Sequence, residues 1–148
     1  VTSRLFAYYP FPMVDIEILE VDVDGVGQPR NDGTRGSALY EVPIKLSATP
    51  SELWAEIAVK TWDHPPASTM MHRPGIASVV GDRFILDGTD LEEVEAHHAQ
   101  TLKLVVQRAN ELTREAEERI RKEEHQRQAE AHAHAENVET VARRIKFD

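Results

Sequence analysis

The C-terminal part of this sequence, residues 89–146, has the composition and the boundaries of one long helix. It begins at a capping box, in which the Thr89 hydroxyl and the Glu92 carboxylate can bond to each other's backbone amides. It ends near Arg143 and Arg144, whose charges suit the negative end of a helix dipole. At about 1.5 Å per residue, an unbroken helix of this length would be about 85 Å long. The residues before it would form a globule with a radius of gyration of about 12 Å, so the helix must project, fold back or pack on another chain.

The composition of the 148 residues, with 41% hydrophobic and 29% charged, is that of an ordinary folded protein. The net charge of −9 repels phosphate, so we do not expect nucleic acid as a partner. The absence of cysteine excludes disulfides, thiolate metal sites and a cysteine nucleophile. The sequence has no apolar run of about 18 residues and no secretory signal pattern, so we expect a cytoplasmic protein with no membrane segment.

Two segments in the first half of the chain alternate apolar and polar residues, which is typical of half-buried strands. In residues 13–24 the alternation slips once after Ile18, which predicts a β-bulge that keeps both apolar sets toward the core. In residues 40–46 the apolar side chains share one face. Pro43 has no N–H, which predicts that this strand is an edge strand or has an unpaired side. Turn-forming residues fill positions 25–37 and predict a flexible loop.

A second capping box, at residues 49–52, predicts a helix that must end before Pro65. After it, residues 76–80 and 83–86 flank a Gly-Asp pair, which indicates a two-residue hairpin. The order of elements is therefore β-β-α-β-β-α. It predicts an α+β fold, with a small antiparallel or mixed sheet covered by helices and a long C-terminal helix that extends beyond the domain.

The predicted long helix changes character along its length. Up to Ile120 it carries an apolar stripe, which can cover the sheet or pair with a partner helix. We therefore expect a globular domain over residues 1–120 and a helical extension over residues 121–148. A break near residues 129–135 that folds the last turns back is the competing geometry. The residues predicted to bind a partner are Leu102, Val105, Ala109, Leu112, Ala116, Ile120, Val138, Val141 and Ile145.

The densest group of reactive side chains lies in residues 62–75, a segment stiffened by three prolines. Rigid placement of acids, bases and hydroxyls is what a catalytic site requires. In this interpretation a histidine would be an oriented base and an arginine would bind an anion. The structural alternative is a tight crossover, in which His and Asp bind the loop backbone while Trp62, Met70 and Met71 fill the edge of the core. The candidate catalytic residues are His64, His72, Arg73 and Asp87.

Several glutamate–histidine pairs have spacings that place both side chains on one helix face. Glu95 and His98 are three residues apart, the spacing found in di-iron helical bundles, and Glu93 and His97 are four apart. A di-iron site needs a second such motif and two further glutamates, which the chain does not have. We therefore expect no metal site and no cofactor.

No spacing in the sequence matches a mechanistic motif, which favours a non-enzymatic protein. We expect a binding or assembly module that forms a homo-oligomer, or docks into a larger complex, through its long helix. The alternative is a small hydrolase-like enzyme or a ligand-binding domain with a polar site in residues 62–75. We expect the aromatic run from Phe6 to Phe11 to pack in the core or in a pocket of a partner.

Overall fold

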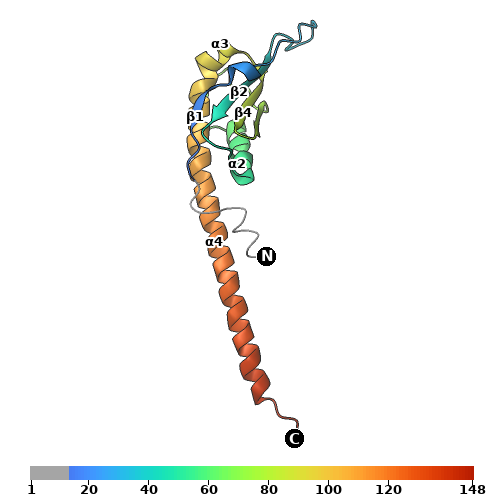
Figure 1. Cartoon of the computed structure of the whole chain (residues 1–148), viewed down its shortest axis with the longest axis vertical. Coiled ribbons are helices and arrows are strands. Elements are labelled where there is room, and N and C mark those ends of the chain that lie inside the picture. The colour runs from blue at the N-terminus through green and yellow to red at the C-terminus, as the bar shows by residue number, and fades with distance from the viewer. Residues whose placement is uncertain (1–13) are drawn as a thin grey trace.

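A computed structural model of the chain, which describes residues 14–148, has four strands in one open antiparallel sheet (Figure 1). The spatial order of the strands is β1-β2-β4-β3. The β-β-α-β-β-α order and the α+β class confirm the prediction. The aromatic run from Phe6 to Phe11 lies outside the described residues. The strands are β1 (Ile18–Val21), β2 (Tyr40–Leu46), β3 (Ala77–Val80) and β4 (Arg83–Thr89).

Helix α2 (Glu52–Asp63) connects β2 to β3. Its N-cap is Ser51, whose hydroxyl accepts a hydrogen bond from the Trp54 amide at 3.1 Å. The predicted cap at Thr49 is therefore two residues too early. The buried side chains Trp54, Ala58 and Trp62 recur at steps of four, which gives α2 one apolar face.

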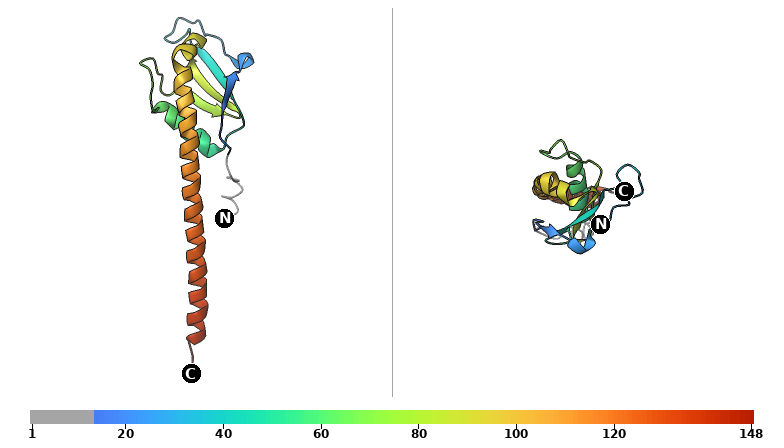
Figure 2. Two further views of the ribbon diagram at one scale, coloured as in Figure 1. Left: turned by 90° about the vertical axis from the view of Figure 1, so that its left-hand side faces the viewer. Right: turned by 90° about the horizontal axis from the view of Figure 1, so that it is seen from above.

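The C-terminal half of the chain is helical from Leu91 to Arg144. It comprises α3 (Leu91–Glu93), one π-helical turn named η2 (Val94–His98), and α4 (Ala99–Arg144). The 46 residues of α4 correspond to about 70 Å of helix. Figures 1 and 2 show α4 running along the domain and then projecting straight beyond it. The alternative geometry, with a break near residues 129–135, is therefore wrong. Within the described residues, no helix has an apolar stretch long enough to cross a bilayer.

The first part of α4 packs on the sheet and on α2, so the apolar stripe covers the domain there. Leu102, Val105 and Ala109 lie in the core with both tryptophans of α2. A buried asparagine joins the same interface: Asn110 Oδ1 accepts from Trp54 Nε1 at 2.8 Å and from the Ile16 amide at 3.1 Å. The sheet contributes Val42, Ile44, Leu46, Phe84 and Leu86 to this core.

The structure corrects two details of the predicted sheet. The bulge occurs as predicted, between Ile18 and Glu20, but it does not keep both apolar sets toward the core. Leu19 is exposed at the bulge, and Val14 and Val23 are exposed because they lie outside β1, which is shorter than the predicted strand.

Of the two alternatives predicted for Pro43, the edge strand is wrong because β2 is an inner strand, and the structure agrees with the other, an unpaired position on the β1 side. The hydrogen-bonded pairing of β2 with β1 ends at Ile44, so Pro43, which has no N–H to donate, lies just past the last pair. The Pro43 carbonyl still accepts from the Asp22 amide at 2.9 Å.

The loop between the first two strands extends away from the domain (Figure 1). The hairpin between β3 and β4 is formed as predicted, with Val80 paired to Arg83. Gly81 has a φ of 58°, which glycine adopts without the steric cost of a side chain.

Candidate functional site

The candidate site begins where β4 passes into the long helix. The predicted cap, Thr89, is instead the last residue of β4 and is paired with Tyr40. Asp90 is the N-cap, and its Oδ1 accepts from the Glu93 amide at 2.7 Å. The helix therefore begins one residue later than predicted, and Glu93 lies in its first turn beside Thr89.

The π-helical turn η2 brings together two residues that an α-helix would keep apart. The amide of Ala99 bonds to the carbonyl of Val94, five residues back. In such a turn, side chains five positions apart lie on one side of the helix. His98 Nε2 accordingly contacts Glu93 Oε1 at 2.7 Å. Spacings of three and four residues predict the pairs Glu95–His98 and Glu93–His97. The pair that forms, Glu93–His98, is therefore not predicted. Single π-helical turns are frequent at functional sites.

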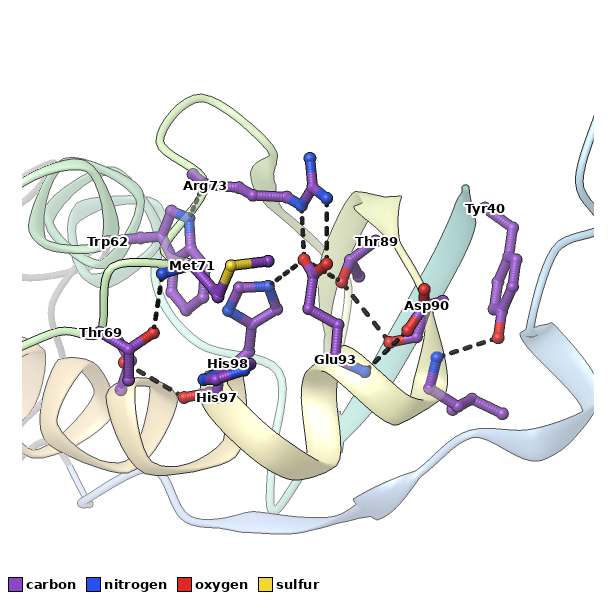
Figure 3. Close-up of polar contacts among 12 residues, drawn as sticks. Tyr40, Trp62, Thr69, Met71, Arg73, Thr89, Asp90, Glu93, His97 and His98 are labelled. Carbon is purple, nitrogen blue, oxygen red and sulfur yellow. Dashed lines mark hydrogen bonds and ion pairs between the residues drawn. The ribbon is translucent and has the colours of Figure 1, made fainter. Parts of the chain in front are cut away.

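Arg73 approaches the same carboxylate from the loop between α2 and β3 (Figure 3). Its Nε donates to Oε1 of Glu93, and its Nη2 donates to Oε2 at 3.0 Å. The Thr89 hydroxyl donates to Oε1 at 2.9 Å. The hydrogen bond from Arg73, helped by those from His98 and Thr89, lowers the pKa of Glu93 from 4.5 to about 2. Glu93 is therefore an ionised, largely buried carboxylate held by three side chains.

Trp62, fully buried at the end of α2, holds the loop against this carboxylate. Its Nε1 donates to the Arg73 carbonyl at 2.8 Å, and its own carbonyl is 2.8 Å from His72 Nε2. The rings of His72 and His98 both pack on the indole, with ring-centre distances of 4.6 Å and 5.5 Å. We call Trp62, His72, Arg73, Thr89, Glu93 and His98 the Glu93 cluster.

The four candidate catalytic residues do not form one group. His72 and Arg73 belong to the Glu93 cluster, whereas His64 is exposed where α2 ends. Asp87 alternates with buried Leu86 along β4, so its side chain points to the other face of the sheet. There it lines a shallow cleft with residues of the 27–39 loop.

Most contacts in the loop agree with the structural interpretation. Asp63 Oδ1 accepts from the Gly75 amide at 2.8 Å, which closes the loop, and Trp62 lies in the core. The methionines do not fill the edge of the core: Met70 and Met71 are exposed. The reason is a turn at Thr69, whose carbonyl accepts from the His72 amide, so that both methionines point outward.

The residues predicted to bind a partner fall into three groups. Leu102, Val105 and Ala109 are in the core of this chain and are not accessible to a partner. In the middle group, Ala116 is buried, and Leu112 and Ile120 are partly buried. The distal group is exposed: Val138 and Val141 lie on the projecting helix, and Ile145 lies just beyond its end.

Within residues 14–148, no group of three or more His, Cys, Asp or Glu side chains could hold a metal ion. Two buried ring nitrogens, Nδ1 of His72 and Nδ1 of His98, have no hydrogen-bond partner among the described residues. Comparison with known proteins finds no matching family model, no similar curated protein and no similar solved structure.

Proposed function

We propose that this protein is a non-enzymatic assembly module that pairs with a second copy of itself through the projecting part of α4. The observation that carries this proposal is that every residue from His125 to Asp148 is exposed, although α4 stays helical to Arg144. Ion pairs on a helix surface contribute only about 0.2–0.5 kcal/mol each. Most helices in proteins are stabilised by packing of an apolar face, which a partner helix would supply here.

The exposed segment carries the apolar residues that such a partner needs. Val138 and Val141 are three residues apart on the helix, and Ile145, the first residue beyond α4, follows four residues later, which together is the spacing of a two-helix seam. Val138 is 50% exposed, and Phe147, just beyond the helix, is 95% exposed. We call Val138, Val141, Ile145 and Phe147 the distal patch.

Charge complementarity supports a second copy as the partner. Three cations, Arg143, Arg144 and Lys146, lie next to the distal patch, whereas the chain as a whole carries a net charge of −9. In an antiparallel pair, the cations of one tip would lie beside the acidic residues that precede the distal patch of the other copy, which include Glu136 and Glu139.

The enzymatic alternative has weaker support. A catalytic site needs its groups within hydrogen-bond reach of one substrate position. His64 lies at the exposed end of α2 and Asp87 points from the other face of the sheet, so neither can act with His72. Arg73 is already engaged by Glu93 through both carboxylate oxygens.

Light scattering coupled to size exclusion tests the proposal. We expect the full chain to be a dimer and the Val138→Glu/Val141→Glu variant to be a monomer, because two buried charges would oppose pairing. Thr140→Glu is the control: it adds one negative charge on another side of the same exposed helix, about 200° from Val138, and should stay dimeric. Glutamate favours helix more than valine does, so the substitutions should not unfold α4.

Two outcomes would count against the proposal. A monomeric full chain at about 100 µM, where weak dimers with micromolar Kd values are populated, would reject self-association. An unchanged dimer in the double variant would place the interface away from the distal patch.

A further inference from the structure

The middle of α4 has a buried face in a region where the helix has already left the domain. Thr113, Glu117 and Glu124 are 0%, 4% and 4% exposed, and Ala116 is 7% exposed. Ile120 is partly buried between them. Helix positions three and four apart lie on one side, so these side chains share one face of α4. We call Thr113, Ala116, Glu117, Ile120 and Glu124 the middle face.

Neighbours within α4 do not cause this burial, as the rest of the same helix shows. From His125 to Arg144 every residue of α4 is exposed, although these residues have helical neighbours of the same kind. Glu124 is buried and His125, the next residue, is exposed, so the burial ends abruptly. The surface that covers the middle face therefore reaches to about Glu124 and no farther.

The helices and strands of the domain end before the middle face does. Trp54, in the first turn of α2, bonds to Asn110 at 2.8 Å, so this end of α2 lies beside Asn110. Glu117 is about 10 Å farther along the helix, and Glu124 is about 21 Å farther. Figures 1 and 2 show that α4 continues there past both α2 and the sheet. The cover of the middle face must therefore come from another part of the chain or from a partner.

The first described residues run along α4 toward the middle face. Ile16 bonds to Asn110 through its amide, at 3.1 Å, and through its carbonyl, at 3.0 Å. Asp15, one residue nearer the N-terminus, accepts from Arg114, which is one helical turn farther along α4. The residues that precede Val14 therefore join the described chain beside the start of the middle face.

Residues 1–13 are long enough to follow the whole middle face. At about 3.3 Å per residue, thirteen extended residues span at most about 43 Å. The distance along the helix from Arg114 to Glu124 is only about 15 Å. A segment tethered at this point has an effective concentration of about a millimolar, which a second copy at micromolar concentration does not match.

The apolar part of the middle face suits the aromatic run Phe6–Phe11. Ala116 has a small side chain, which leaves room for a ring, and Ile120 offers an aliphatic surface beside it. Aromatic rings bury large apolar areas while their hydroxyls stay at the rim. Pro10 and Pro12 favour an extended chain over a helix, and an extended chain can lie along a helix as a strap.

The polar part of the middle face needs hydrogen-bond partners. Burial raises the pKa of Glu117, because it disfavours the charged form of the carboxylate. The Thr113 hydroxyl is fully buried and has no hydrogen-bond partner among the described residues. Residues 1–13 have one cation and two long hydroxyl side chains that can donate hydrogen bonds: Arg4, Tyr8 and Tyr9.

We propose that residues 1–13 dock on the middle face of their own chain, with the aromatic run Phe6–Phe11 covering Ala116 and Ile120. This docking goes beyond self-association and uses a different part of the helix. The distal patch begins at Val138, fourteen residues after Glu124, so a second copy can pair there while the middle face is occupied. The two apolar zones of α4 then have different partners: the chain's own N-terminal segment and a second copy.

Carboxyl labelling with a carbodiimide and glycinamide, read by mass spectrometry on the full chain, tests the docking. A buried carboxylate reacts only when the structure opens locally, so Glu117 and Glu124 should be labelled about tenfold more slowly than exposed glutamates. Glu115 and Glu118, exposed on the same turns of α4, are the internal references.

The Phe6→Ser/Phe11→Ser variant removes two rings from the segment and leaves every described residue unchanged. Both buried glutamates should then be labelled within about twofold of the rate of Glu118, because the middle face is uncovered. Val14→Ser is the matched control: it removes an apolar side chain from the same end of the chain, but Val14 is 78% exposed, so labelling should not change. Circular dichroism verifies folding; if the double variant unfolds, the two single variants replace it.

Fast labelling of Glu117 and Glu124 in the unchanged chain would overturn the proposal, because the middle face would then be open. Slow labelling that persists in the folded Phe6→Ser/Phe11→Ser variant would also overturn it, since the cover would then be something other than the aromatic run.

Dilution from about 100 µM to about 1 µM distinguishes docking within one chain from docking on a second copy, because only the second depends on concentration. Protection that is lost on dilution would assign the middle face to another copy and overturn the proposal. The Val138→Glu/Val141→Glu variant keeps residues 1–13 and the middle face, so both glutamates should stay protected in it. Docking and self-association can therefore fail independently of each other.

Discussion

Nε2 of His98 donates a hydrogen bond to Oε1 of Glu93 at 2.7 Å, and the two residues are five positions apart in the chain. In an α-helix, side chains five positions apart point about 140° away from each other. The π-helical turn Val94–His98 reduces that offset. Because Glu93 also binds Arg73 and Thr89, this turn connects the long helix to the loop after α2 and to the end of β4.

Glu93→Gln should destabilise the fold. The substitution removes the carboxylate that accepts from Arg73, His98 and Thr89 in a largely buried site. Breaking a buried ion pair costs about 3–5 kcal/mol, and the partial exposure of Arg73 reduces this to about 2 kcal/mol. Urea unfolding followed by circular dichroism measures the change. Glu92→Gln, one residue away and exposed, is the control and should be within about 0.5 kcal/mol of the unchanged chain.

The stability of the protein should fall in acid through the same carboxylate. The pKa of Glu93 is about 2 in the folded chain, below its ordinary value of 4.5, so the ionised form stabilises the fold above pH 4.5. This contribution, up to about 3 kcal/mol, is lost as the pH falls from 4.5 to 2. Urea midpoints at pH 7, 4 and 3 should therefore decline less steeply for Glu93→Gln. Parallel declines would show that other carboxylates dominate.

Asn110→Ala should be strongly destabilising. Its side chain accepts from Trp54 Nε1 and from the Ile16 amide, and donates to the Ile16 carbonyl at 3.0 Å. The substitution leaves these buried groups without partners, at a cost of about 3 kcal/mol. Gln107→Ala, on the exposed side of α4, should change the free energy of unfolding by less than about 0.5 kcal/mol. Similar values for the two variants would show that the asparagine network does not stabilise the fold.

A chain that ends after Arg127 should keep the stability of the domain. The residues removed are exposed throughout, and the cut preserves the ion pair of Arg127 with Glu124 at 2.9 Å. At a concentration below that of dimer formation, the free energy of unfolding should change by less than about 1 kcal/mol. A larger loss would mean that the projecting helix stabilises the domain of its own chain.

The elements of the fold follow from local patterns that the sequence displays directly. Alternation over residues 40–46 predicts β2, the Gly81-Asp82 pair predicts the hairpin, and an apolar repeat predicts the long helix. These predictions succeed because side-chain period and turn chemistry act within a few residues. Both helix N-caps differ from the predicted ones: they are Ser51 and Asp90. Several residues in each segment can cap a helix, and contacts with neighbouring elements determine which one does.

The Glu93 cluster could be predicted only in part. His72 and Arg73 were recognised as a polar group, but their partner Glu93 is 20 residues from Arg73, and no local pattern links them. His98 was assigned to the wrong glutamate because periodicity assumes a regular α-helix, and a single π-helical turn leaves no periodic signal in the sequence. A helix start at Asp90 would have placed Glu93 correctly in the first turn.

By itself, the sequence determined the α+β order and a C-terminal helix too long for its domain. Tertiary structure decided what that helix does. One apolar stripe can cover a sheet or meet a partner; Leu102 and Val105 cover the sheet, while Val138 and Val141 remain exposed. The physical reason is that the hydrophobic effect is non-directional, so an apolar side chain can be buried against any apolar surface that it meets in the folded protein. Helix and strand patterns, in contrast, depend only on neighbours along the chain.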